Sequence, residues 1–505
     1  MAKRTVSLLL ALLFCFAIAV LAACSDGKPE ESNNNSAGDS TSDSVSEGPH
    51  FLPEARVWDK EITVLVYAND GHPFSTIIIP EELNNEPIND AFYNRNSRIE
   101  RDYGIKLNLA TCSTPAEGVE WLRNDYMTGA CNYNIASIPL TYIAPLGIEG
   151  LLYDIYEIDN GYIHYNEPWW DQAAIRDLTI NNKLWFLAGD AIIEDDEATW
   201  AIYYNKDLVE KYNLETPYDL VKSNQWNLDT FHEMAKKVFQ MNGSTRSYDP
   251  SVGDVWGAVV QSYDCYAFML GAGQPMVVLD DGTPRFRVQE EANVNTFYKV
   301  LDLMLDDQNV GVADFFGRWD SGVYGQESDI FCNGNALFMP STISLVSGDK
   351  MRNAEIHYGI APMPKANELQ DEYTTSVSVY WCQVMVIPKA NNDKDTLDAT
   401  CYAMEAMAYY GKELVTPEYY TRTLTLKRFP DSDNTEMLDL IFRNRTYDLA
   451  GIFDFGTVNG NGAGSLYFYT SLLGAKSSDI TSFWETKKDL FESAMADLMA
   501  SVQGE

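Results

Sequence analysis

The sequence predicts an α/β fold built from more than one domain. Strand-like and helix-like segments alternate between residues 61 and 136, a pattern typical of a parallel sheet covered by helices. Helical patterns dominate the final third of the chain, so we expect a helical C-terminal part. At 505 residues the chain is long enough for two or three domains of roughly 150 residues each.

The predicted sheet begins with residues 61–67 (EITVLVY), a β-branched run of the kind that forms buried strands. Apolar residues then recur at helical spacing from Ile88 to Tyr103. Gly104 follows at the position of a left-handed C-terminal cap, and residues 105–109 form the next strand pattern. These segments predict the first strand–helix–strand unit.

A second helix is predicted to begin after Thr114. Thr114, Pro115 and Glu117 supply the N-cap, the first-turn proline and the acidic partner of a capping box. A third strand pattern follows at residues 133–136. Helical patterns dominate from about residue 205 to 331, and further strand patterns occur at 184–188, 199–204, 336–339, 357–361 and 379–387.

The charge balance excludes one class of partner. Seventy-four acidic residues outnumber 36 basic ones, which gives a formal net charge of −38. Such a chain repels phosphate backbones, so we expect no nucleic-acid partner. The same negative field disfavours anionic ligands such as phosphate or sugar acids.

The N-terminus is predicted to be an export signal. Lys3 and Arg4 precede an apolar run from Val6 to Ala23. The run LAAC, which ends at Cys24, resembles the bacterial lipobox. That resemblance implies cleavage of residues 1–23 and attachment of lipid to the Cys24 sulfur, which anchors a protein to a membrane without a spanning helix. An uncleaved spanning anchor is the alternative interpretation, because the run is just long enough to cross a bilayer.

Residues 24–56 are predicted to comprise the lipidated cysteine and a disordered tether. The stretch from Ser25 to Pro49 is rich in serine and asparagine and holds no aromatic residue. It cannot bury enough apolar surface to offset the entropy of an ordered chain. We therefore expect a globular protein that is lipid-anchored at the extracellular face of the cell membrane.

Several motifs carry a family resemblance. Within residues 200–238 occur YNKDL, then a PYDL turn at 217–220, then Trp226 at the start of a helix. RDYGIK, NGNALFM and YGIAPMP occur at 101–106, 333–339 and 358–364. In their order and spacing, from about residue 57 to the end of the chain, these motifs resemble the bacterial extracellular solute-binding proteins of family 1, the sugar-type group of ABC importers that includes the maltose-binding protein.

The resemblance implies a two-lobed, type II periplasmic-binding-protein-like fold, in which crossover hinge strands join two α/β domains. The N-terminal lobe would comprise residues 57–198 and 336–378, and the C-terminal lobe residues 199–335 and 379–505. Hinge closure would enclose a ligand between the lobes. The resemblance implies a monomeric binding protein, not an enzyme, which captures a carbohydrate, with an oligosaccharide favoured, and delivers it to an ABC transporter permease.

A sugar site needs flat aromatic faces and groups that bond to hydroxyls. Candidate residues follow strand patterns at their carboxyl ends, where open α/β sheets bind ligands. Others lie in a Gly-rich loop or at the first and second crossovers, which the resemblance implies near residues 197–203 and 379–383. The candidate ligand-binding residues are Asn69, Asp70, His72, Thr141, Tyr142, Glu197, Trp200, Trp256, Tyr263, Trp319, Tyr324 and Trp381. The competing interpretation of each is structural, as a loop cap or as buried core.

Other features are expected to be structural. Trp169 and Trp170 are expected to pack rather than to bind. The acidic run from Glu194 to Glu197 is expected to be a solvated turn, since catalytic carboxyl pairs face each other across a cleft. No motif indicates a cofactor or a metal site, and the cysteine spacing indicates neither zinc nor a dense disulfide framework. Cys112 and Cys131 could pair, although buried free thiols are the favoured interpretation.

Two alternative functions are also compatible with the sequence. One is a surface glycoside hydrolase or another carbohydrate-active enzyme. The other keeps the fold but binds a peptide or a cation, or acts as a sensor.

Overall fold

The computed structural model describes residues 56–68, 74–240, 254–315, 326–421, 424, 431–457 and 463–504. The predicted export signal, Cys24 and the tether lie outside these residues. Among the helices of the described part, none combines the length and the apolar character that a membrane crossing requires.

The first lobe is built on a four-stranded sheet in the order β12-β3-β1-β2. β1 is parallel to β2 and β3, and β12 is antiparallel to β3. The strands are β1 (Lys60–Tyr67), β2 (Ile105–Cys112), β3 (Ile135–Pro139) and β12 (Gln383–Val386). The parallel sheet predicted from residues 61–136 is therefore confirmed.

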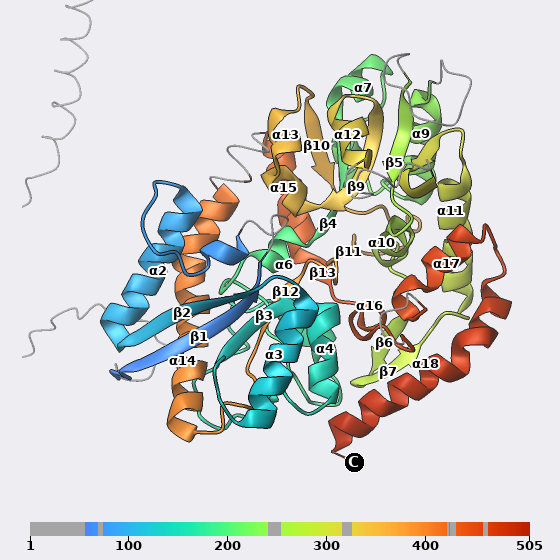
Figure 1. Ribbon diagram of the computed structural model, residues 1–505. Coiled ribbons are helices and arrows are strands. Elements are labelled where there is room, and N and C mark those ends of the chain that lie inside the picture. The colour runs from blue at the N-terminus through green and yellow to red at the C-terminus, as the bar shows by residue number, and fades with distance from the viewer. Residues whose placement is uncertain are drawn as a thin grey trace, which may run out of the picture. The chain divides into compact units, whose positions relative to one another are not determined.

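Four helices cover this sheet, namely α2 (Pro87–Tyr103), α3 (Pro115–Thr128), α4 (Leu140–Ile148) and α14 (Lys394–Tyr410). α2 contacts α14, and α3 contacts α4 (Figure 1). The chain moves from β1 outward to β2 and then back past β1 to β3, so right-handed crossovers place α2 and α3 on opposite faces. Both predicted caps are present: Gly104 has φ +62°, and the Thr114 hydroxyl accepts a hydrogen bond from the Glu117 amide at 3.2 Å.

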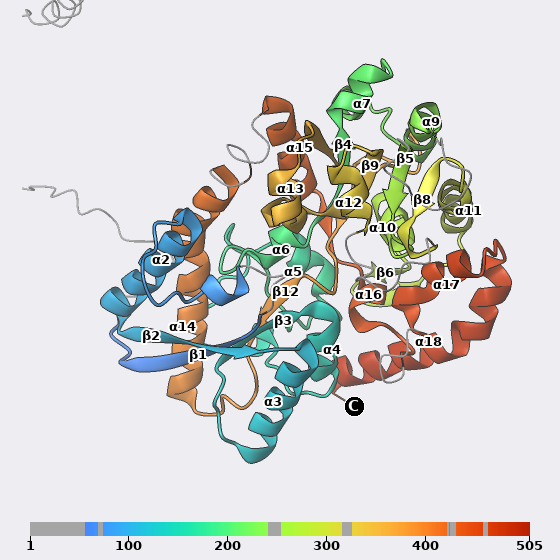
Figure 2. The same cartoon turned by 45° about the horizontal axis from the view of Figure 1, so that its top comes forward.

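The second lobe is built on a mixed five-stranded sheet in the order β10-β4-β9-β5-β8. Figure 2 labels β4, β9, β5 and β8 of this sheet. Its strands are β4 (Trp200–Asn205), β5 (Trp256–Val260), β8 (Val310–Val312), β9 (Ala336–Thr342) and β10 (Tyr358–Ala361). Its helices are α7 (Lys206–Lys211), α8 (Pro217–Lys222), α9 (Leu228–Val238), α10 (Asp264–Gly271), α11 (Glu291–Leu305), α12 (Gln326–Cys332), α13 (Asp349–Asn353) and α15 (Ser432–Arg443). A separate hairpin consists of β6 (Val277–Asp280) and β7 (Thr283–Phe286).

The strand pairing corrects the predicted division of the chain between the lobes. Residues 336–378 were expected in the first lobe, yet β9 and β10 both pair with β4 of the second. Residues 379–505 were expected in the second lobe, yet β12 pairs with β3, and α14 contacts β1. A strand pattern in the sequence shows that a segment is extended, but it does not show with which strand that segment pairs. The predicted lobe boundaries were wrong for this reason. Residues 184–188 were predicted to form a strand, but they form only a single β-bridge, between Leu187 and Met385.

Three chain segments run side by side where the lobes join. Thr199 pairs with Val377, and the Ser378 amide donates to the Ala198 carbonyl at 2.8 Å. On the other side, β11 (Thr375–Ser376) is parallel to β13 (Arg445–Thr446). These segments, 198–199, 375–378 and 445–446, are called the crossing.

The C-terminal part is helical, as predicted, and it touches both lobes. It comprises α16 (Leu449–Phe453), α17 (Phe468–Gly474) and α18 (Ile480–Gln503). α17 packs against α10 and α11 of the second lobe, whereas α16 and α18 contact α4 of the first. Figure 2 shows α18 running from α17 toward α4, where the Ser501 hydroxyl donates to the Ile148 carbonyl at 2.8 Å.

The thiols of all six cysteines in the described part are free. Cys112 and Cys131 are therefore not paired. Instead, Cys112 is buried beneath α3, close to Gly118, and the Cys131 thiol lies 3.2 Å from the Asn391 side-chain oxygen. Cys112 is therefore the buried free thiol that the sequence favoured, whereas Cys131 is free but only partly buried.

Candidate functional site

Five aromatic side chains meet where the two lobes and the crossing approach each other. The Tyr142 ring of α4 lies 6.2 Å from the Tyr380 ring, which in turn lies 6.1 Å from Tyr263. Tyr263 also contacts Trp200 at 6.1 Å, and the Tyr380 hydroxyl lies 2.6 Å from that of Tyr467. We call these five residues the interlobe aromatic cluster.

Different parts of the chain position the members of the cluster. Tyr142 belongs to the first turn of α4, where the Thr141 amide donates to the carbonyl of Val379, the residue that directly follows the crossing segment 375–378, at 3.2 Å. Trp200 begins β4, and Tyr263 follows β5 at its carboxyl end. Tyr380 follows the crossing, and Tyr467 ends a short 3-10 helix of the C-terminal part (Ser465–Tyr467). Both lobes therefore contribute rings to one place.

The five rings differ in how far they are exposed to solvent. Tyr142 is 37% exposed, whereas Trp200 is only 7% exposed. Tyr263, Tyr380 and Tyr467 are partly buried against the core. The cluster thus offers at least one accessible aromatic face, backed by rings that other side chains hold in place.

The structure brings together some predicted site residues and separates others. Tyr142, Trp200 and Tyr263 lie in the cluster, Thr141 lies beside Tyr142, and Trp381 is half-buried next to Tyr380. Trp256 does not join them, because it is 2% exposed in β5 and packs against Phe239 at 5.6 Å. Asn69, Asp70, His72, Trp319 and Tyr324 lie outside the described residues.

Two members of the cluster were not among the predicted site residues. Tyr380 stands next to the predicted Trp381, so its position at the second crossover was already a usable signal. No signal in the sequence pointed to Tyr467. It lies 87 positions from Tyr380 in the chain and meets it only through the folding of the C-terminal part.

The acidic run 194–197 is not the solvated turn that the sequence suggested. It forms the short helix α6 (Glu194–Glu197), in which Glu194, Asp195 and Glu197 are buried. The guanidinium of Arg445, from β13, lies 2.8 Å from Asp196 and 3.5 Å from Asp195. A buried cation from a distant part of the chain therefore permits the burial of these acids.

Arg445 also joins the crossing to the first lobe. It lies 2.9 Å from Asp171, whose carboxylate caps α5 (Gln172–Leu178) and accepts a hydrogen bond from the Tyr447 hydroxyl at 2.7 Å. Burial lowers the pKa of Arg445, but the charges around it, Asp171 foremost, outweigh that effect and raise the pKa. The guanidinium remains charged and holds the crossing segments against each other.

Glu197 was predicted to reach a ligand, but its carboxylate is engaged inside the protein. It accepts hydrogen bonds from Tyr419 at 2.6 Å and from Ser347 of the second lobe at 3.2 Å. Burial raises its pKa to about 8, against hydrogen bonds that lower it. Glu197 thus links segments at the crossing.

Trp169 and Trp170 are structural, as expected from the sequence. Their indole N–H groups donate to the buried carboxylate of Glu405 at 3.0 and 2.9 Å. The His164 ring lies 3.0 Å from the same carboxylate. These bonds fasten the segment 164–170 to α14.

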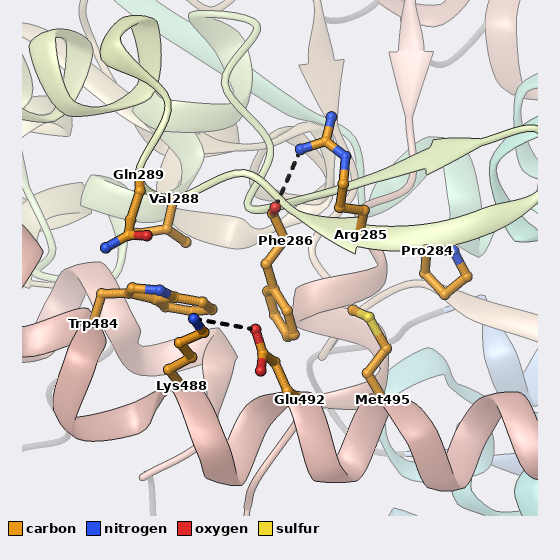
Figure 3. A pocket seen from close by; sticks show the side chains of 9 residues that line it. All are labelled: Pro284, Arg285, Phe286, Val288, Gln289, Trp484, Lys488, Glu492 and Met495. Atoms are coloured by element: carbon orange, nitrogen blue, oxygen red, sulfur yellow. Dashed lines mark hydrogen bonds and ion pairs between the residues drawn. The ribbon is translucent and has the colours of Figure 1, made fainter.

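A cavity of about 260 Å³ lies between the β6–β7 hairpin and α18. Figure 3 shows the Phe286 ring between Trp484 and Met495, with the Lys488–Glu492 ion pair beside them. Its other lining residues are Pro284, Arg285, Val288 and Gln289. None of the lining residues belongs to the interlobe aromatic cluster, which lies among different elements.

The structure has two α/β lobes, which are joined by a multi-segment crossing and meet at a shared aromatic cluster. This architecture is that of the two-lobed binding-protein folds. No protein-family model matches the chain, and no curated protein matches it in sequence. Solved structures do match its fold. UgpB of Mycobacterium tuberculosis, solved with glycerophosphocholine, has a TM-score of 0.56 and 13% identity over 86% of this chain and 99% of its own.

Two further solved structures are similar. The cyclic α-maltosyl-1,6-maltose-binding protein of Arthrobacter globiformis has a TM-score of 0.54 at 13% identity, over 88% of this chain and 100% of its own. An ABC substrate-binding protein of Listeria monocytogenes, solved with cycloalternan, has a TM-score of 0.53 at 15% identity, over 86% of this chain and 98% of its own. The chain therefore has the two-lobed fold of maltose-binding-protein-like substrate-binding proteins of ABC transporters.

Proposed function

We propose that this protein is the substrate-binding component of an ABC importer, which captures a carbohydrate between its lobes and delivers it to a membrane permease. One observation carries the proposal: the interlobe aromatic cluster draws its rings from the first lobe, the second lobe and the region of the crossing. Tyrosine and tryptophan rings suit the CH faces of sugar rings and lose little entropy on binding. A ligand held by both lobes would stabilise the closed form.

The proposed ligand is an oligosaccharide. Among the solved structures of the same fold, the Listeria protein was solved with cycloalternan, and the protein from Arthrobacter binds a cyclic maltosyl-maltose. We further propose a non-enzymatic, monomeric protein, lipid-anchored through Cys24 at the extracellular face of the membrane. The motifs at the N-terminus support this location.

The test is a thermal-shift screen of the purified globular part, residues 51–505, against neutral oligosaccharides of different linkage and length. A bound ligand raises the melting temperature by mass action, so a true ligand is expected to produce a concentration-dependent rise. Tryptophan fluorescence should change in parallel. If no glycan raises the melting temperature, the proposal fails.

A surface glycoside hydrolase is the rival, and product analysis separates the two. The binding protein should leave every glycan that it binds intact after prolonged incubation. Release of shorter sugars, abolished by substitution of a single carboxylate, would establish the enzyme instead.

A further inference from the structure

The β6–β7 hairpin and α18 are held together by a core of aromatic rings. The Phe286 ring of β7 lies 5.1 Å from the Trp484 ring and 6.0 Å from the Phe491 ring, both of which belong to α18. Figure 3 shows the Phe286 ring beside Trp484. Trp484 and Phe491 are buried, and aromatic rings packed in this way contribute more than their buried area alone. We call the hairpin and α18 together the brace.

The brace is attached to the second lobe. In the chain, the hairpin lies between α10 and α11 of that lobe. α17, which precedes α18, packs against α10 and α11, and its Phe468 ring lies 6.1 Å from the Trp484 ring. The side of the brace that faces the second lobe is therefore fixed by chain connection and by aromatic packing.

Two hydrogen bonds between described residues join the brace to the first lobe. At the hairpin tip, the Gly282 carbonyl accepts from the Asn181 amide at 2.9 Å. Gly282 has φ +80° and Asn181 has φ +47°, so two tight turns from different lobes meet at their tips. At the end of α18, the Ser501 hydroxyl donates to the Ile148 carbonyl of α4 at 2.8 Å, and the adjacent Val502 side chain is buried.

The two sides of the brace differ in strength. A hydrogen bond contributes little net free energy to folding, because water replaces it when it breaks. Two such bonds and the end of α18 hold the first lobe, whereas buried aromatic rings hold the hairpin to α18. α16 also contacts α4, but it begins soon after the crossing segment 445–446 and so lies close to the hinge in the chain. When the lobes part, the contacts of the brace with the first lobe should therefore give way first.

We propose that the brace is a releasable restraint on the hinge. It holds the first lobe in the arrangement in which the rings of the interlobe aromatic cluster meet, and its contacts at Asn181 and at Ile148 open together when the lobes part. Because both contacts are made by one packed unit, they break as one cooperative event. This inference concerns the hinge of the fold, goes beyond the proposed function and requires no ligand for its test.

Hydrogen exchange at backbone amides, measured by mass spectrometry on the purified protein, tests this coupling. Val502→Asp places a charge in the buried end of α18 and should detach that end from α4. The Asn181 amide, on a different element, should then exchange at least about tenfold faster, because the same opening event exposes it. Ser501→Ala removes one hydrogen bond and should speed exchange of the same amide about fivefold.

Ala496→Asp is the matched control, because it adds the same charge to the exposed face of the same helix. It should leave exchange at Asn181 unchanged. Exchange in β1, in the core of the first lobe, should stay slow in every variant; if Val502→Asp accelerates it, that variant unfolds globally and Ser501→Ala decides. Unchanged exchange at Asn181 in the deciding variant would show that the two contacts open independently, and it would overturn the proposal.

The distance between the lobes provides the second measurement. Spin labels at Met127 of α3 and Glu233 of α9, both exposed, are attached through ketone-bearing amino acids, so that the native free thiols do not react. In the sugar-free protein, the deciding variant should broaden the distribution of distances, whereas Ala496→Asp should match the parent chain. A distribution equal to that of the parent chain would overturn the restraint.

The outcomes keep the two proposals apart. Coupled release of the brace in a protein that binds no glycan supports the brace and refutes the proposed function. Glycan binding by the parent chain, combined with unchanged exchange and unchanged distances in the variants, refutes the brace and leaves the proposed function intact.

Discussion

The hydroxyl groups of Tyr380 and Tyr467 lie 2.6 Å apart and join the region of the crossing to the C-terminal part of the chain. α16 and α18, which belong to the same C-terminal part, also contact α4 of the first lobe. Any hinge motion that separates the lobes must therefore accommodate this segment. The contact between the two tyrosines thus links the region of the crossing to the packing of the C-terminal part.

Removal of either hydroxyl should weaken this connection. Tyr380→Phe and Tyr467→Phe are each expected to lower the free energy of unfolding by about 1 kcal/mol, the usual net value of one hydrogen bond. The double variant should lose little more than either single variant, because one bond is broken in all three. Urea denaturation measures the cycle. Strictly additive losses would show that the hydroxyls act independently.

Tyr142 should contribute to ligand binding without supporting the fold. Its ring is 37% exposed, so Tyr142→Ala is expected to change the melting temperature of the free protein by no more than about 2 °C. Loss of the stacking face should weaken glycan binding at least about tenfold. Calorimetry with a glycan found in the screen provides the measurement.

Tyr126→Ala is the matched control for Tyr142, because Tyr126 is 44% exposed on α3 of the same lobe and lies outside the cluster. It should leave the affinity unchanged. Similar losses in both variants would remove Tyr142 from the proposed site.

Glu197 should make stability depend on pH. Burial raises its pKa in the folded protein to about 8 from an ordinary 4.5, so the folded state holds the proton more tightly than the unfolded state. The favourable contribution of protonated Glu197 to the free energy of unfolding is therefore complete below pH 4.5 and is lost as the pH rises to about 8. The loss is at most about 1.4 kcal/mol per pH unit.

Glu197→Gln cannot ionise and should gain stability relative to the parent chain between pH 5 and pH 8.5, as followed by thermal denaturation. Glu233→Gln, on the exposed face of α9, serves as the control. Parallel pH profiles for the parent chain and Glu197→Gln would contradict the raised pKa.

His164 should also make the stability of the fold depend on pH, through its interaction with Glu405. Its hydrogen bond to Glu405 raises the pKa of the ring above the ordinary 6.5, against the opposing effect of burial. The stabilisation is complete below pH 6.5 and is lost as the pH rises through the raised value. The stability advantage over His164→Gln should therefore shrink from pH 6 to pH 8.5 in thermal melts.

His357→Gln is the control for His164, because the His357 side chain is 83% exposed beside Asp207. An advantage of the parent chain over His164→Gln that is constant across the pH range would show that the ring does not titrate there.

Cys24→Ser tests the proposed lipid anchor. Without the thiol no lipid can be attached, so the protein should move from the membrane fraction to the soluble or secreted fraction on cell fractionation. Substitution of Cys112, a buried thiol of the globular part, should leave the location unchanged. Continued membrane association of Cys24→Ser would indicate that the apolar run from Val6 to Ala23 is retained as an anchor.

Much of the local structure could be predicted from the sequence. The strand at 61–67, the C-cap at Gly104 and the N-cap at Thr114 are all present, because each depends on backbone geometry within a few residues. The predicted capping box is not complete, because the Glu117 carboxylate accepts from the Ser113 amide rather than from that of Thr114. Tyr142, Trp200 and Tyr263 were also identified as site candidates from their positions at strand ends and at a crossover. The predicted two-lobed α/β fold is confirmed by the two sheets and by the solved structures that share it.

Contacts between distant parts of the chain were decided by the tertiary structure alone. The pairing of β9 with β4, the approach of Tyr467 to Tyr380 and the burial of α6 against Arg445 leave no local signature. Arg445 and Asp196 are 249 positions apart, and whether those acids face solvent or a guanidinium depends on how the whole chain packs. The sequence by itself determined the elements, their caps and the supply of aromatic rings. Only the assembled lobes decided which strands share a sheet, which rings meet and which charges are buried, because those outcomes depend on packing summed over the entire chain.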